Sequence, residues 1–119
     1  MQDSNTTIQE LKNIVAAFID EREWSQFHSP KNLSMLIAIE AAELMEKFQW
    51  CDTAQSYRDA KINKDEVEQE LADVIIAALC LSRAANIDIA GALERKMQIN
   101  ACNYPVSKAK GVCTKYDKL

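Results

Sequence analysis

The sequence predicts an all-α fold of long helices joined by short connections. Only two glycines and two prolines occur among 119 residues, which disfavours tight β-hairpins and Gly-rich phosphate-binding loops. Apolar residues make up 48% of the chain and recur with helical periodicity, so the helices can bury a core. The length allows one compact domain but not two.

Four helices are predicted, over about residues 7–23, 30–48, 64–83 and 89–104. The first begins at Thr6 or Thr7, because each of these residues starts a capping box. Ser29 as N-cap and Pro30 at the first helical position open the second helix. The third has acidic residues in its first turn and Arg83 at its end, as the helix dipole prefers.

The remaining segments are predicted to be irregular. Cys51–Asn63 is polar and without periodicity, so we expect a loop there. Asp88 can cap the fourth helix, which stops before Pro105. Residues 105–119 carry a charge of +3, against −7 for residues 1–104. We therefore expect a single helical domain over residues 1–104 and a basic C-terminal tail over 105–119 that is mobile or wraps a neighbour.

Charge and cysteine content exclude several classes of protein. The net charge of −4 offers no electrostatic surface for a nucleic-acid polymer. The four cysteines lack C-x-x-C spacing and the one histidine is distant in sequence, which disfavours zinc and makes disulfides unnecessary. The longest apolar run, Val74–Leu81, is far shorter than the roughly 20 residues that span a bilayer. We expect a soluble, cytoplasmic protein that has neither a membrane nor a nucleic-acid polymer as partner.

Two of the predicted helices carry carboxylates on their apolar faces. Glu40 falls within the apolar stripe of the second helix, and Glu43 follows one turn later. Glu70 and Asp73 repeat this arrangement on the third helix. Buried carboxylates are destabilising unless a counter-charge neutralises them. Two such pairs on packed helices supply four oxygen ligands, which favours Mg²⁺, or Mn²⁺ as a substitute, over zinc or iron.

These acidic residues also fit roles that need no metal. A single carboxylate is as well explained by solvent exposure or by an ion pair with Lys47, Arg58 or Arg83. For the whole pattern, the alternative to a metal site is a helical interaction module with charged seams.

A phosphorylated substrate is the leading interpretation of a metal site of this kind. Mg²⁺ bound by few carboxylates completes its coordination with phosphate oxygens and water. Lys31, Lys96 and Asn100 are candidate phosphate ligands, although each is also an ordinary surface residue type. Aromatic and imidazole rings that could stack on a base, or instead cap the core, flank the second helix at Trp24, Phe27, His28 and Trp50.

Motifs in four segments follow one another in a characteristic order. They are EREWSQFHSPKNL from Glu21, EAAELMEKFQW from Glu40, ELADV from Glu70 and KMQIN from Lys96, the last followed by Tyr104-Pro105. Over about residues 8–106 these motifs closely resemble the MazG-like nucleotide pyrophosphohydrolases, and within them the dCTP-pyrophosphatase-like branch.

The resemblance implies a fold, an assembly and an activity. The fold is a four-helix bundle of the MazG-like type, assembling as a dimer or a dimer of dimers. The activity is Mg²⁺-dependent hydrolysis of (deoxy)nucleoside triphosphates, such as dCTP or dATP, to the monophosphate and pyrophosphate. Its expected role is sanitation or control of the nucleotide pool.

The resemblance also implies roles for individual residues. The metal ligands would be Glu40, Glu43, Glu70 and Asp73. By its position rather than by the resemblance, Glu46, one turn beyond Glu43, could orient or deprotonate the attacking water, and Glu43 is an equal candidate for this role. Together with the patterns above, the predicted substrate-binding residues are Trp24, His28, Lys31, Asn32, Trp50, Lys96 and Asn100.

The base-binding region departs from the family pattern. Val15 and Ala77 stand where vertebrate dCTP-selective relatives have a histidine and a tyrosine. A roomier pocket would follow, which leaves dATP and other deoxynucleotides open as substrates. Two rival functions remain: a phosphoribosyl-ATP pyrophosphatase, which the Phe48-Gln49-Trp50 motif argues against, and a non-catalytic nucleotide-sensing or assembly module.

Overall fold

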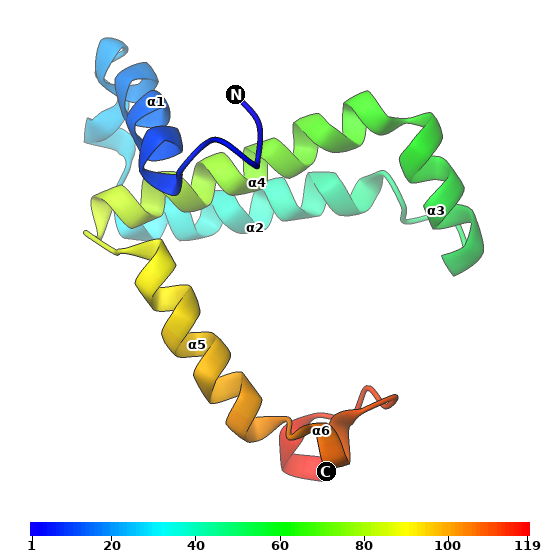
Figure 1. Ribbon diagram of the computed structural model, residues 1–119. Helices are drawn as coiled ribbons and strands as arrows, with labels where there is room; N and C mark the ends of the chain where they lie inside the picture. Colours follow the sequence, from blue (N-terminus) through cyan, green and yellow to red (C-terminus); the bar gives the residue numbers. More distant parts are fainter. The chain divides into compact units, whose positions relative to one another are not determined.

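The computed structural model describes residues 1–119 and consists of helices without β-strands (Figure 1). The α-helices are α1 (Ile8–Glu21), α2 (Pro30–Glu46), α3 (Thr53–Ile62), α4 (Lys64–Ala84), α5 (Ile89–Asn103) and α6 (Val106–Ala109). Two 3-10 helices, η1 (Trp24–Phe27) and η2 (Tyr116–Lys118), complete the secondary structure. The prediction of an all-α protein is confirmed.

The chain forms two compact units, Met1–Ile87 and Asp88–Leu119. The predicted division between a domain over residues 1–104 and a tail over 105–119 stays a prediction. No single helix has the length and apolar character needed to cross a bilayer, and the interrupted pair α4 and α5 reaches that threshold by length and composition only.

Side-chain caps begin the helices at the predicted residues. The Thr7 hydroxyl accepts a hydrogen bond from the backbone N–H of Glu10 at 3.1 Å, and the Glu10 carboxylate accepts one from the Thr7 N–H at 2.6 Å. Of the two possible capping boxes, the one at Thr7 therefore starts α1. Ser29 caps α2 by accepting from the Asn32 N–H at 3.1 Å, and Asp88 caps α5.

The end of α4 is closed by a left-handed turn at Asn86, whose φ is 53°. The N–H of Asn86 donates to the Arg83 carbonyl at 3.2 Å, and the N–H of Ile87 donates to the Ser82 carbonyl at 2.7 Å. This pattern satisfies the last carbonyl groups of the helix, and asparagine tolerates the left-handed conformation better than most residues. The predicted break before the fourth long helix is thereby confirmed.

The core of the first unit lies where α1, α2 and α4 meet. In Figure 1, α2 runs alongside α4. Helix α1 contacts the C-terminal half of α4. Ile19 from α1, Leu33 from α2 and Cys80 from α4 form the buried cluster. Burial also raises the pKa of the Cys80 thiol, so this side chain stays protonated and packs as a small apolar group.

A polar clamp joins the ends of α1 and α4. The Arg83 guanidinium donates to both carboxylate oxygens of Asp20, at 2.8 and 2.9 Å. These hydrogen bonds lower the pKa of the Asp20 carboxyl. The Ser25 hydroxyl donates to the same carboxylate at 3.2 Å, so the clamp also fixes the start of η1.

Two segments differ from the sequence prediction. The predicted loop Cys51–Asn63 contains α3, which begins with a capping box between Asp52 and Gln55. Its apolar side chains are largely exposed, 77% for Tyr57 and 69% for Ile62, so no buried stripe marks it in the sequence. The predicted basic tail contains the short helices α6 and η2.

We expect Leu33→Ala to lower the free energy of unfolding by about 3 kcal/mol, because the side chain is 1% exposed and its loss leaves a cavity among three helices. Chemical denaturation followed by circular dichroism measures this. Leu93→Ala, at a leucine that is 54% exposed on α5, is the matched control and should change stability far less. Equal effects of the two substitutions would contradict the assignment of the core.

Candidate metal centre

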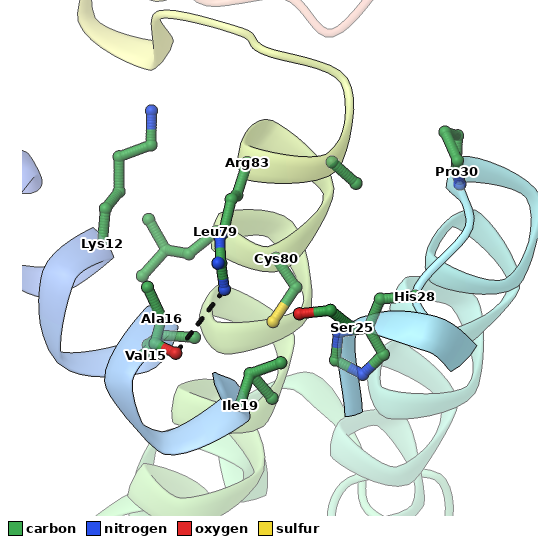
Figure 2. Close-up of a pocket in the computed structure, with 11 residues that line it drawn as sticks. Lys12, Val15, Ala16, Ile19, Ser25, His28, Pro30, Leu79, Cys80 and Arg83 are labelled. Carbon is green, nitrogen blue, oxygen red and sulfur yellow. Dashed lines mark hydrogen bonds between the residues drawn. The ribbon is translucent and has the colours of Figure 1, made fainter. Parts of the chain in front are cut away.

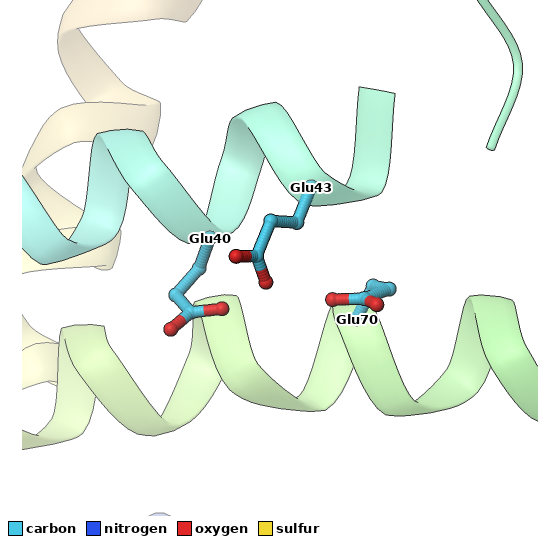
Figure 3. Close-up of side chains that lie close together, drawn as sticks. All are labelled: Glu40, Glu43 and Glu70. Atoms are coloured by element: carbon cyan, nitrogen blue, oxygen red, sulfur yellow. The ribbon is translucent and has the colours of Figure 1, made fainter. Parts of the chain in front are cut away.

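Three glutamates converge between α2 and α4. Figure 3 shows Glu40 and Glu43 projecting from α2 toward the helix that carries Glu70. One carboxylate oxygen from each residue lies within 4.8 Å of one from each of the other two. Glu40 and Glu43 share a helical face because they are three residues apart, and the packing of α2 along α4 brings Glu70 to them. We call these three residues the carboxylate cluster.

The cluster lies at the edge of the interface between the two helices and is only partly buried. Glu40 and Glu70 are half-buried, whereas Glu43 and Asp73 are exposed. The expectation that all four acids are buried is therefore wrong for Glu43 and Asp73, although Glu43 does project toward α4. Their position at the edge leaves the cluster open to ions and ligands from solvent.

Repulsion within the cluster changes the acidity of Glu40. Partial burial raises the pKa of the Glu40 carboxyl, and the negative charges of Glu43, Asp73 and Glu70 raise it further. Asp73 therefore acts electrostatically on the cluster, although it does not belong to the group of converging oxygens. The negative charges of the neighbouring acids thus act together on Glu40.

The cluster fits a hard divalent cation. Ligand oxygens about 2.1 Å from an octahedral Mg²⁺ lie roughly 3–4 Å from one another. The three oxygens of the cluster need only small side-chain movements to reach that separation. All donors are carboxylate oxygens and no cysteine or histidine belongs to the group, which suits magnesium, calcium or manganese better than zinc.

One cation of the protein already contacts the cluster. The ammonium of Lys47, at the end of α2, lies 3.8 Å from Oε1 of Glu70 and 3.3 Å from Oε2 of Glu66. The possible ion pair between Lys47 and an acidic residue is confirmed for these two partners. Neither Arg58 nor Arg83 forms an ion pair with the cluster, since Arg83 is bound to Asp20.

A cavity of about 340 Å³ lies between α1, η1 and the C-terminal half of α4 (Figure 2). Its floor is apolar, with Val15, Ile19 and Cys80, and its polar edge includes Ser25 and His28. His28 thus lines a cavity, and its role in substrate binding stays a prediction. The sequence did not predict this cavity because the residues that line it come from two segments far apart in the chain, and no local sequence pattern shows that these segments are in contact.

The other predicted substrate-binding residues of the first unit are dispersed. Trp24 in η1 is 42% exposed and packs edge-on against Phe18, with ring centroids 5.8 Å apart. Trp50, beyond the end of α2, is 90% exposed. Lys31 is exposed in the first turn of α2. Neither tryptophan lines the cavity beside His28.

Asn32 has a structural role that the sequence did not indicate. Its side-chain amide donates to the carbonyl oxygen of Phe27 at 3.0 Å, which holds η1 against the start of α2. Glu46, the second candidate base, is exposed at the last position of α2 and lies outside the carboxylate cluster. Lys96 and Asn100 both lie on α5, one turn apart, in the second unit.

The fold and the site define an all-helical protein with an acidic centre between two packed helices. Residues 35–119 match the MazG-like family, and the chain belongs to this family. Two similar proteins are dCTP pyrophosphatase 1 from Rattus norvegicus, 35% identical, and from Homo sapiens, 32% identical. Each alignment of 115 residues covers 95% of this chain and 68% of the relative.

A solved structure is also similar to this chain. It is a pyrophosphatase from Archaeoglobus fulgidus DSM 4304, with a TM-score of 0.81 and 40% sequence identity. The match covers 88% of this chain and 98% of the other. Together with the curated relatives, this neighbour supports assignment of the chain to the nucleotide pyrophosphohydrolases as a class of enzyme.

We expect Glu40→Gln to raise the melting temperature of the metal-free protein at pH 7 by about 2–4 °C, because it removes one of the repelling charges. The folded protein holds the Glu40 proton more tightly than the unfolded chain does, so wild-type stability falls as pH rises from 4.5 through the raised pKa. The advantage of the variant should therefore disappear at pH values below 4.5. Thermal unfolding across this pH range measures it.

Glu94→Gln, which removes an exposed charge on α5, is the control and should show no such dependence on pH. A Glu40→Gln variant that is less stable than wild type at pH 7 without metal would contradict the account of repulsion in the cluster.

Proposed function

We propose that this protein is a Mg²⁺-dependent pyrophosphohydrolase that converts (deoxy)nucleoside triphosphates, such as dCTP or dATP, to the monophosphate and pyrophosphate. The observation that carries the proposal is the convergence of Glu40, Glu43 and Glu70 at one point between α2 and α4. The names of the curated relatives, which are dCTP pyrophosphatases, support this choice of substrate class.

The carboxylate cluster would hold the ion, with Asp73 nearby as a fourth ligand. When bound, Mg²⁺ neutralises charge on phosphate oxygens and orients the reacting groups. Mn²⁺ would substitute for it, since both ions prefer oxygen ligands. The raised pKa of Glu40 supports the site, because a carboxyl crowded by like charges is stabilised in its ionised form by a cation.

Hydrolysis requires a water molecule to attack the α-phosphorus while the bond to the bridging oxygen breaks and pyrophosphate leaves. The proton released by the water passes to a carboxylate, for which Glu43 and Glu46 are the candidates. Both are exposed side chains on α2, and Glu43 also belongs to the cluster. We favour Glu43 as the group that orients the water, and Glu46 as the alternative acceptor.

Each of the two units carries predicted substrate-binding residues. We propose that Trp50 encloses the base together with Trp24 and His28 of a second copy of the chain, because α2 separates Trp50 from the other two within one copy. Lys31 in the first unit, and Lys96 and Asn100 in the second, would contact the phosphates and the sugar. Asn32 would contribute through its side-chain oxygen, since its amide group already binds the Phe27 carbonyl. Val15 in the wall of the cavity supports tolerance of bases other than cytosine, because it occupies less space than the histidine expected there.

We also propose that the chain forms a MazG-like four-helix bundle and assembles as a homodimer or a dimer of such dimers. The protein would act in the cytoplasm on the free nucleotide pool. Large apolar side chains on one face of α1 and α4 support the assembly. Ile14, Leu71 and Ile75 are 49%, 49% and 47% exposed and line one apolar groove. A second copy of the chain would cover this face.

We expect the purified protein to release monophosphate and pyrophosphate from at least one common nucleoside triphosphate with Mg²⁺, and to release nothing with EDTA. Glu43→Gln and Glu70→Gln should each lower turnover by about 100-fold or more, because each removes a charged ligand, while the helical circular dichroism stays unchanged. Chromatography of the products identifies both the bond cleaved and the preferred base.

Glu94→Gln is the activity control and should keep full turnover. Full turnover by either cluster variant would contradict the metal site. Nucleotide-induced thermal stabilisation without product would instead favour a sensing module, and turnover of phosphoribosyl-ATP alone would favour the rival enzyme.

A further inference from the structure

We propose that Lys47 is a positioning residue that competes with the divalent cation for Glu70 and thereby sets the affinity of the site for that cation. The inference deepens the proposed function and rests on the metal site assigned there. It concerns a lysine that is neither a predicted metal ligand nor a predicted substrate-binding residue.

Lys47 lies at the end of α2 and reaches across to the Glu70 carboxylate on α4. It caps the C-terminal end of α2, and its ammonium extends to α4, where it contacts two carboxylates one helical turn apart, on Glu66 and Glu70. The side chain of Lys47 is 29% exposed and that of Glu70 is 21% exposed, so this pair is better shielded from solvent than an ordinary surface ion pair. Glu66, at 65% exposed, anchors the ammonium from the outer side.

The Lys47 ammonium and the proposed divalent cation interact with the same carboxylate. The Glu70 carboxylate belongs to the carboxylate cluster and also lies 3.8 Å from the Lys47 ammonium. Without a divalent ion, the lysine offsets part of the repulsion within the cluster. When a divalent ion binds to the same carboxylate, the ion and the Lys47 ammonium repel each other. The Glu70 carboxylate then has to interact with two cations at once, which weakens its interaction with each.

The size of this effect follows from elementary electrostatics. A divalent and a monovalent cation about 6 Å apart repel one another enough, even with the dielectric constant of water, to weaken ion binding by about tenfold. Added salt screens charges over about 8 Å at physiological ionic strength, so the effect should diminish as the salt concentration rises. Lys47 would thus lower the affinity of the site for the ion, so that a higher free concentration of the ion is needed to fill it.

The test measures ion binding without substrate. Mn²⁺ is titrated into the full-length protein and the free ion is followed by electron paramagnetic resonance, with Mg²⁺ titrated by calorimetry. We expect Lys47→Met to lower the Kd for both ions by about tenfold, and Lys47→Arg, which keeps the charge, to remain near wild type. Lys64→Met is the matched control, because Lys64 pairs with Glu68 on the same helix α4 and both side chains are exposed.

The outcomes separate this inference from the proposed function. A Lys47→Met variant that binds Mn²⁺ no more tightly than Lys64→Met, or more weakly than wild type, overturns the role of Lys47 while leaving the metal site intact. A wild-type protein that binds neither ion overturns both. A purely structural lysine would lower the melting temperature on substitution without changing the Kd of the ion.

Discussion

The packing of α2 along α4 is the interaction on which the rest of the structure depends. Apolar contacts around Leu33 and Cys80 hold the N-terminal part of α2 against the C-terminal part of α4. Further along the same pair of helices, that packing forces Glu40, Glu43 and Glu70 together. The favourable burial at one end of the helix pair thus maintains an unfavourable concentration of negative charge at the other, and this charge is what can bind a cation.

The same geometry leaves the first unit with a small core. Its buried side chains are few, and much of the apolar surface of α1 and α4 stays exposed. Carboxylates occupy positions along the α2 and α4 interface that apolar residues would fill in a protein optimised for stability alone. In the proposed function, a cation at the cluster and a second copy on the apolar face would each add stability by binding the folded chain.

Much of this arrangement could be predicted from the sequence. Caps at Thr7, Ser29 and Asp88 set the helix starts, because they depend only on residues within one turn. The two acidic pairs indicated the site, since their spacing fixes a helical face. Helix α3 was not predicted because few of its side chains are buried. The predicted burial of Glu43 was wrong because residue spacing alone does not distinguish the edge of a helix interface from its centre. Long-range contacts such as Arg83 with Asp20 leave no local pattern at all.

The most direct test of the central claim is the position of a bound ion. Crystals of the protein grown or soaked with Mn²⁺ would be measured at a wavelength where manganese scatters anomalously. We expect one or more anomalous peaks within about 2.2 Å of carboxylate oxygens of Glu40, Glu43 and Glu70. Anomalous peaks found only elsewhere on the chain, with the Lys47 ammonium still against Glu70, would contradict it.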